Sequence, residues 1–161
     1  MKKQTVVAAA LGAAVLAGAS VFGLSQMSGS PVSPISMAAA SAEAVVYKSP
    51  WCGCCTGYSE ALRAAGYEVR EEEHEDMNPI KRRLGVPEDM TSCHTTVIGG
   101  YVVEGHVPLA ALERLLSERP EIHGIALPGM PTGVPGMPGP RPERIEVLKL
   151  GADAGELYSL E

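Results

Sequence analysis

The sequence has no excess of positive charge and, beyond its N-terminus, no long apolar run. Its 161 residues carry 13 lysines and arginines against 19 aspartates and glutamates, a formal net charge of −6. This acidic balance argues against a nucleic-acid partner, because binding to phosphates requires a basic face. After residue 24 no segment stays apolar over the ~20 residues that span a bilayer. The length leaves room for a single domain.

Cysteine is also scarce, but its distribution is uneven. Three of the four cysteines lie in the segment 52–55, which reads Cys-Gly-Cys-Cys, and the fourth, Cys93, directly precedes His94. Three thiols cannot all pair with one another, so a disulfide with a spare thiol is the less favoured explanation. Cys52 and Cys55 have the C-x-x-C spacing of a redox dithiol. All four cysteines together offer a thiolate-rich site for a soft metal such as Cu(I).

The first 42 residues are typical of a targeting segment followed by a linker. Lys2 and Lys3 precede an uncharged stretch, residues 5–24, and small-x-small cleavage patterns lie close to residue 42. Cleaved export to the periplasm is favoured over an uncleaved anchor in the inner membrane. Spare thiols are normally lost to disulfides in an oxidising compartment. The cysteine cluster would therefore need a bound metal or a dedicated reductant.

Residues 43–161 have the patterns of one α/β domain. Strands are predicted at 44–48, 67–70, 95–98, 101–103, 145–150 and 156–160, and helices at 54–65, 79–84 and 108–118. Gly99-Gly100 indicates a tight hairpin, and Asn78 is expected to cap the second helix. The order is strand, helix, strand, helix, two strands, helix. It predicts a thioredoxin-like sandwich, with a central mixed sheet flanked by helices and a C-terminal β-hairpin.

The segment 127–142 is rich in Pro, Gly and Met and is predicted to be a loop, because proline removes hydrogen-bond donors and clashes with helix. Its methionines, Met130 and Met137, recur in similar Pro-Gly-Met-Pro sequences. Methionine often fills gaps in a core, but a thioether also suits Cu(I). If the loop folds back over the first helix, it brings one of these sulfurs toward the cysteines.

The cysteine segment is predicted at a helix N-terminus, where unpaired N–H groups and the helix dipole favour thiolates. Thiolates serve both redox and metal chemistry. Trp51 and the segment 52–55 resemble the Trp-Cys-Gly-Pro-Cys motif of thioredoxins, with Cys54 in place of Pro. Cys93-His94 also stands before Thr95, where thioredoxin-like oxidoreductases carry a cis-proline. Both differences favour coordination over disulfide exchange. A structural zinc site suits the crowding poorly, because such sites usually combine two separated pairs.

Several motifs together resemble the bacterial copper-resistance CopG family. The resemblance is carried by residues 47–55, 85–87, 92–95, 105–108, 128–131 and 136–137. It implies an exported, periplasmic copper-binding protein with a thioredoxin-like fold. It also implies that the cysteines hold a multinuclear Cu–thiolate cluster.

We therefore expect a periplasmic copper-binding protein in copper resistance or homeostasis, which meets copper ions and other periplasmic copper-handling proteins. The expected thiolate ligands are Cys52, Cys54, Cys55 and Cys93. The expected outer or exchangeable ligands are His94, His106, Met130 and Met137. The alternative is a thiol–disulfide or copper oxidoreductase, with Cys52 as nucleophile and Cys55 as resolving thiol.

The alternative for Cys93 is an inert buried cysteine, for His94 a residue that fills a turn, and for His106 a helix cap or a solvent-exposed histidine. His74, Met77 and His123 are expected at the surface. Trp51 is expected to pack beside the cluster and limit the access of water.

Overall fold

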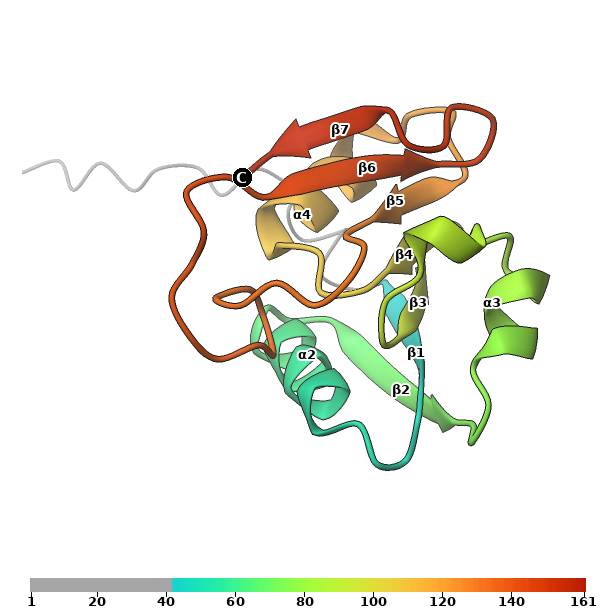
Figure 1. Ribbon diagram of the computed structural model, residues 1–161, viewed down its shortest axis with the longest axis vertical. Coiled ribbons are helices and arrows are strands. Elements are labelled where there is room, and N and C mark those ends of the chain that lie inside the picture. Colours follow the sequence, from blue (N-terminus) through green and yellow to red (C-terminus); the bar gives the residue numbers. More distant parts are fainter. Residues whose placement is uncertain (1–41) are drawn as a thin grey trace, which may run out of the picture. The chain divides into compact units, whose positions relative to one another are not determined.

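The computed structural model describes residues 42–161 (Figure 1). The predicted signal peptide or anchor and its linker, residues 1–42, lie outside this part except for Ala42. Within residues 42–161, no helix has the length and apolar character needed to cross a membrane.

Residues 42–161 form a seven-stranded mixed sheet in the order β2-β1-β3-β4-β5-β6-β7. The strands are β1 (Glu43–Lys48), β2 (Glu68–Glu73), β3 (Thr95–Ile98), β4 (Tyr101–Glu104), β5 (Gly124–Ala126), β6 (Glu146–Leu150) and β7 (Leu157–Leu160). The pairs β1/β2 and β4/β5 are parallel, and the other neighbouring pairs are antiparallel. Each parallel pair is joined by a crossover helix, as parallel strands require.

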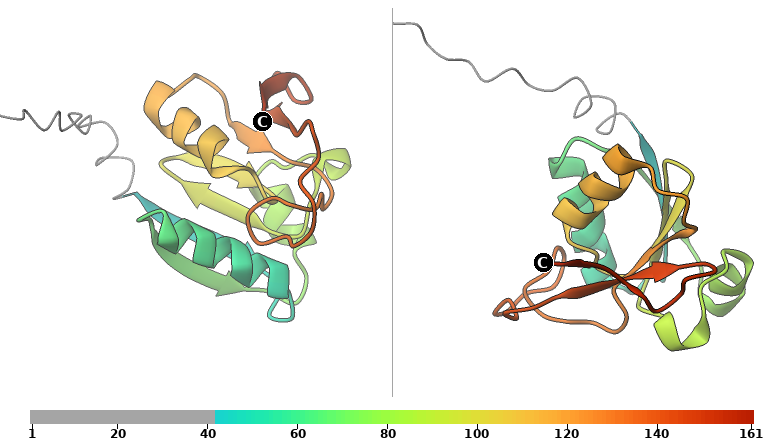
Figure 2. Two further views of the ribbon diagram at one scale, coloured as in Figure 1. Left: turned by 90° about the vertical axis from the view of Figure 1, so that its left-hand side faces the viewer. Right: turned by 90° about the horizontal axis from the view of Figure 1, so that it is seen from above.

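Three α-helices cover the sheet: α2 (Gly53–Ala64), α3 (Asn78–Arg83) and α4 (Leu109–Glu118). Helices α2 and α4 lie on one face of the sheet, and α3 lies on the other (Figures 1 and 2). Alternation along the strands divides the core accordingly. Val103 belongs to the larger hydrophobic cluster, which includes residues of α2 and α4. Its neighbour Val102 points to the other face and belongs to a separate, smaller cluster.

The predicted class, an α/β domain with a central mixed sheet flanked by helices, is confirmed, and so is the C-terminal hairpin of β6 and β7. The β3–β4 hairpin turns at Gly99 and Gly100, whose φ angles are +58° and +88°. Two consecutive positive φ angles match the tight turn that Gly-Gly predicts. The predicted order of strands and helices up to α4 is also present; the thioredoxin-like assignment built on that order stays a prediction.

The sequence missed two short elements, β5 and the 3₁₀ turn η1 (Glu88–Met90). Each has three residues, too few to show a period. The prediction for Asn78 was wrong by one position. Asn78 is the first residue of α3, and its backbone N–H donates to the carboxylate of Asp76 at 2.9 Å.

Candidate metal centre

The cysteine segment lies at the start of α2, as predicted. Cys52 is the N-cap residue, with extended backbone angles, and its sulfur accepts a hydrogen bond from the Cys55 N–H at 3.3 Å. The cap satisfies one of the N–H groups that a helix start leaves unpaired. Cys54 and Cys55 follow in the first turn. The first β-strand and its turn thus deliver three sulfur atoms to the positive end of one helix dipole.

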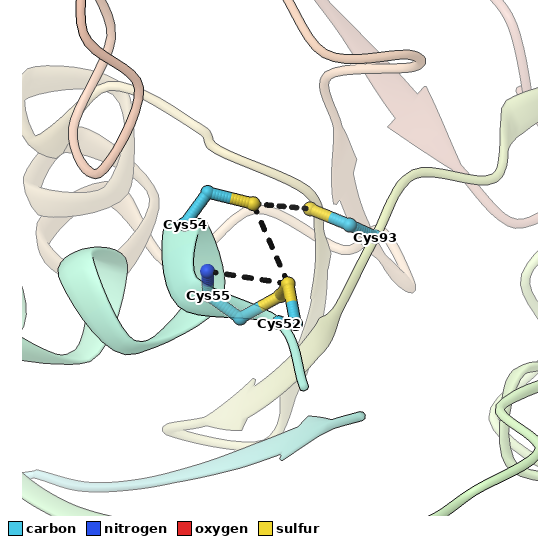
Figure 3. A group of neighbouring side chains, drawn as sticks. All are labelled: Cys52, Cys54, Cys55 and Cys93. Carbon is cyan, nitrogen blue, oxygen red and sulfur yellow. Dashed lines mark hydrogen bonds between the residues drawn. A yellow bond between two sulfur atoms is a disulfide. The ribbon is translucent and has the colours of Figure 1, made fainter. Parts of the chain in front are cut away.

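The fourth cysteine joins them from the segment before β3 (Figure 3). The sulfurs of Cys52, Cys54, Cys55 and Cys93 all lie within 4.8 Å of one another. Cys54 Sγ is 3.4 Å from Cys52 Sγ and 3.9 Å from Cys93 Sγ. Cys93 is 39 residues distant in sequence from Cys54, so the fold assembles this cluster.

The structure shows the cluster in an oxidised state. Cys52 and Cys55 form a disulfide, and Cys54 and Cys93 are free thiols. In this state two of the four expected thiolate ligands are tied to each other. This disulfide is the bond that the C-x-x-C spacing of a redox dithiol leads one to expect. All four sulfurs nevertheless lie within 4.8 Å of one another, close enough to contact one metal centre.

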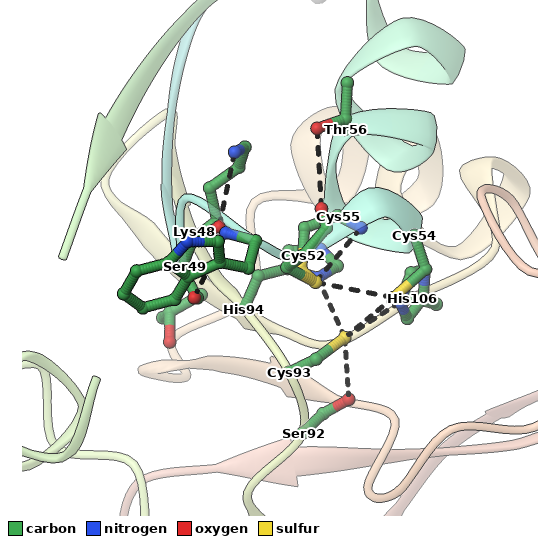
Figure 4. Close-up of a disulfide and its surroundings, with 12 residues drawn as sticks. Lys48, Ser49, Cys52, Cys54, Cys55, Thr56, Ser92, Cys93, His94 and His106 are labelled. Carbon is green, nitrogen blue, oxygen red and sulfur yellow. Dashed lines mark hydrogen bonds between the residues drawn. A yellow bond between two sulfur atoms is a disulfide. The ribbon is translucent and has the colours of Figure 1, made fainter. Parts of the chain in front are cut away.

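Cys93 also contacts two histidines (Figure 4). Its sulfur is 2.9 Å from His106 Nε2 and 3.5 Å from His94 Nδ1. His106 Nδ1 lies 2.8 Å from the carbonyl oxygen of Pro135. A carbonyl only accepts, so Nδ1 carries the proton and Nε2 of the neutral ring presents a lone pair to Cys93.

His94 is fully buried beside Tyr58. Their ring centroids are 4.6 Å apart, and the centroid of His106 lies 4.7 Å from that of His94 in an edge-on arrangement. His94 Nε2 is buried and has no hydrogen-bond partner among the described residues. Such an atom costs free energy unless something binds it. Cys93, His94 and His106 form a second group whose ligand atoms lie within 4.8 Å of one another.

Burial sets the protonation of this group. Loss of solvent raises the pKa of the Cys93 thiol to about 12, and the neighbouring Cys54 adds to the effect. Burial also lowers the pKa of His94 well below its usual value, helped by His106 and Lys81, and it lowers the pKa of His106. Without metal, the stable arrangement is a neutral thiol hydrogen-bonded to a neutral imidazole.

The Pro/Gly/Met loop folds back over the first helix. Gly136 packs against Gly57, and a Cβ placed on Gly136 would lie 2.5 Å from the Cys54 carbonyl oxygen. Met137 is half-buried against the main core. Met130 is 60% exposed. The contact with α2 and the bond from His106 to Pro135 place the loop over the cysteine end of α2; a methionine facing copper stays a prediction.

The remaining expectations have mixed outcomes. Trp51 is 74% exposed, so the prediction that it packs beside the cluster was wrong. It lies in the turn between β1 and α2. His123 is exposed, as expected, and its Nε2–H donates to the Leu84 carbonyl oxygen at 2.7 Å. His74 is partly exposed beside Glu72.

Sequence reasoning missed several residues that shape the centre. One is Tyr58, whose hydroxyl donates to the Val107 carbonyl at 3.1 Å and whose ring packs against both histidines. The Pro135 carbonyl is invisible in a side-chain pattern. Glu104 ends an otherwise apolar strand, and an acidic residue in that place was a sequence signal for a functional side chain.

The donor set fits a soft metal. Thiolates and imidazoles suit Cu(I), zinc and related ions, and no carboxylate belongs to either ligand group. The orphaned Nε2 of His94 marks a place where a further bond is missing. With the disulfide reduced, Cys52, Cys54, Cys55 and Cys93 would supply thiolates. His94 and His106 would supply nitrogen.

Comparison with known proteins places this centre in a family. Residues 90–137 match a family model described as a protein of unknown function, DUF411. No curated protein matches the chain.

Two solved structures are similar to the chain. One is described as copper resistance protein CopG, form 2, with 40% identity, a TM-score of 0.69, and coverage of 75% of this chain and 98% of that one. Form 1 gives 40% identity and a TM-score of 0.67, with coverage of 74% and 96%. At this identity and coverage, the chain belongs to the CopG family of copper resistance proteins.

Proposed function

We propose that this chain is a periplasmic copper-binding protein of copper resistance or homeostasis, and that its cysteines hold a multinuclear Cu(I)–thiolate cluster. The observation that carries the proposal is the gathering of four sulfurs within 4.8 Å of one another. The similar solved structures, described as copper resistance proteins, support the choice of metal. A thiolate can bridge two metal ions, so four thiolates can hold more than one Cu(I) ion.

Copper loading requires a reduced centre. The Cys52–Cys55 disulfide must first take up two electrons and two protons from a dithiol reductant, which yields two thiols. Each thiol then releases its proton as it becomes a ligand, because the thiolate is the metal-binding form. For Cys93 this proton is held firmly, since its pKa is raised to about 12. Metal binding therefore competes directly with protons at this sulfur.

The histidines and the loop would complete the site. His106 presents Nε2 toward Cys93, with its tautomer fixed by Pro135. Outer partners of this kind orient a metal ligand. Met130 is the most exposed of the expected ligands. As a weak, exchangeable thioether at the surface, it suits transfer of Cu(I) to or from another periplasmic copper-handling protein.

A second candidate function, thiol–disulfide or copper oxidoreduction, is favoured by the disulfide itself. Cys52 is partly exposed at the helix N-cap and Cys55 is buried, as expected for a nucleophile and a resolving thiol. Cys54 and Cys93 have no required place in that chemistry. The two functions thus make different demands on Cys93.

A cysteine substitution series tests the proposal. The four single variants, each with one cysteine replaced by Ser, are reduced and titrated with Cu(I) against a copper chelator. A shared cluster predicts that every variant binds fewer Cu(I) ions than the wild type. A Cys93→Ser protein with full copper loading would remove Cys93 from the site. Insulin reduction by the wild type at a thioredoxin-like rate would favour the oxidoreductase.

A further inference from the structure

Glu104 is a buried carboxylate that neither candidate function uses. It ends β4 and is fully buried. Burying a charge is costly unless it is paired and hydrogen-bonded. Its pairing partner is Lys81 of α3, whose ammonium contacts Oε1 and is itself nearly inaccessible to solvent. The ion pair explains how the carboxylate tolerates burial, but not what it does there.

The other partners of Glu104 lie on either side of the Cys93-His94 segment. Oε1 accepts a hydrogen bond from the Ser92 backbone N–H at 2.6 Å. Oε2 accepts one from the Thr95 hydroxyl at 2.6 Å. Lys81 reinforces the second bond, because its ammonium also donates to the Thr95 hydroxyl at 3.2 Å. One carboxylate therefore holds both ends of the four-residue segment that carries two expected copper ligands.

The position of Glu104 in the sheet explains how its carboxylate reaches both Ser92 and Thr95. Thr95 is the first residue of β3 and stands opposite Glu104 in the antiparallel register. Before Thr95 the segment leaves the sheet, and regular pairing no longer fixes it. The neighbouring Gly105 N–H still binds the His94 carbonyl at 2.9 Å. Glu104 extends this attachment to Ser92, two residues before His94 and on the other side of Cys93.

We propose that Glu104 is a positioning residue of the copper site: its carboxylate holds Ser92 and Thr95 and thereby fixes Cys93 and His94 toward the other cysteines. The inference rests on the proposed function. The alternative is that Glu104 and Lys81 only stabilise the fold. An ion pair with that role alone could be replaced by apolar side chains with little loss of stability and no effect on the copper site. The two roles differ in what happens to Cys93 when the charges are removed but the volume is kept.

Two double variants separate them. Lys81→Met with Glu104→Gln removes both charges and leaves an amide oxygen that can accept from Ser92 N–H. Lys81→Met with Glu104→Met removes both charges and both oxygen acceptors at nearly the same volume, and leaves only a weakly accepting thioether. Neither double variant leaves an unpaired buried charge, which would threaten folding in a single variant. A third variant, Leu115→Ala in the core of α4, lowers stability without touching the segment.

The first measurement is Cu(I) affinity in a chelator competition, on reduced full-length protein at a temperature where urea titration shows every variant folded. Loss of a group that orients a metal ligand typically weakens metal binding about 10- to 100-fold. We expect a loss of this size in the Met double variant. The Gln double variant and Leu115→Ala should stay close to the wild type.

The second measurement uses no copper. Alkylation of the free thiols in the disulfide form is followed by peptide mass spectrometry, which separates Cys93 from Cys54. Cys93 should react faster in the Met double variant than in the Gln double variant. Equal affinities and equal alkylation rates in the two double variants would overturn the role of Glu104 while leaving the proposed function intact. A wild type that takes up no Cu(I) would overturn both.

Discussion

Cys93 Sγ lies 2.9 Å from His106 Nε2, and the opposite ring nitrogen of that histidine is bound to the Pro135 carbonyl. The contact joins three parts of the chain: the segment before β3, the turn after β4 and the Pro/Gly/Met loop. It brings the Cys93 sulfur and the Nε2 lone pair of His106 into direct contact. A proton occupies the space between them in the metal-free protein, where a metal could bind both atoms.

Replacement of His106 should weaken copper binding. His106→Asn removes the Nε2 lone pair next to Cys93 and keeps an amide N–H close to the position of Nδ1, which can donate to the Pro135 carbonyl. We expect Cu(I) affinity to fall by about 10- to 100-fold, the range for loss of a supporting group at a metal site. Chelator competition measures it. His123→Gln, at an exposed histidine away from the centre, is the control and should bind copper like the wild type.

The metal-free protein should lose stability in mild acid through His94. Burial holds the native pKa of His94 well below the ordinary value of about 6.5. Between these two values the unfolded chain binds a proton that the native state does not, so stability falls as the pH drops below about 6.5. The wild type should therefore be less stable at pH 5.5 than at pH 7.5, by an amount on the order of 1 kcal/mol.

Urea unfolding at the two pH values checks this contribution. The comparison is between the wild type and His94→Gln, which cannot take up the proton. The wild type should lose more free energy of unfolding between pH 7.5 and 5.5 than the variant does. Equal losses would show that His94 is already protonated in the native state or that its burial is relieved.

The loop should be sensitive to a side chain at Gly136. This glycine has a φ of +79°, and a Cβ on it would lie 2.5 Å from the Cys54 carbonyl oxygen and 2.6 Å from the Tyr58 nitrogen. Gly136→Ala should therefore lower the free energy of unfolding by about 1–3 kcal/mol. The control is Gly129→Ala in the same loop, where φ is +72° but nothing lies within 4 Å. Gly129→Ala should cost less, and equal costs would deny the close packing of the loop on α2.

The methionines should affect copper exchange more than copper binding. Replacing Met130 and Met137 with Leu preserves apolar volume, so folding should stay nearly intact. Copper transfer from the loaded protein to a chelator should change in rate, or the loaded protein should change in its sensitivity to oxidation. Single variants assign the effect, since Met130 is exposed and Met137 is half-buried. Identical exchange kinetics and oxidation sensitivity in the double variant would exclude a role for both.

The sequence predicted the elements with clear periods and the residues with distinctive chemistry. Alternating strands, the leucine face of α4 and the Gly-Gly turn all lie in local patterns. The clustering of Cys93 with the helix cysteines was expected from donor chemistry and family resemblance. Local patterns did not reveal the short strand β5, because three residues of an apolar segment carry no period.

Other features depend on tertiary contacts that no local pattern encodes. The 74% exposure of Trp51 depends on which parts of the chain reach its turn. The tautomer of His106 depends on a backbone carbonyl 29 residues away in sequence. The Cys52–Cys55 disulfide was one of several outcomes that the spacing allowed. Glu104 stands out in the sequence as an acid at the end of an apolar strand, but its contacts with Ser92, Thr95 and Lys81 are visible only in the structure.

The account depends most directly on how many Cu(I) ions the reduced protein holds and what surrounds them. Metal analysis after anaerobic Cu(I) loading, together with Cu K-edge absorption on the same sample, measures both. We predict more than one Cu(I) per chain, sulfur-dominated coordination and a copper–copper contribution to the scattering. Tight binding of a single zinc ion, with no Cu(I) uptake in competition with a copper chelator, would contradict the account.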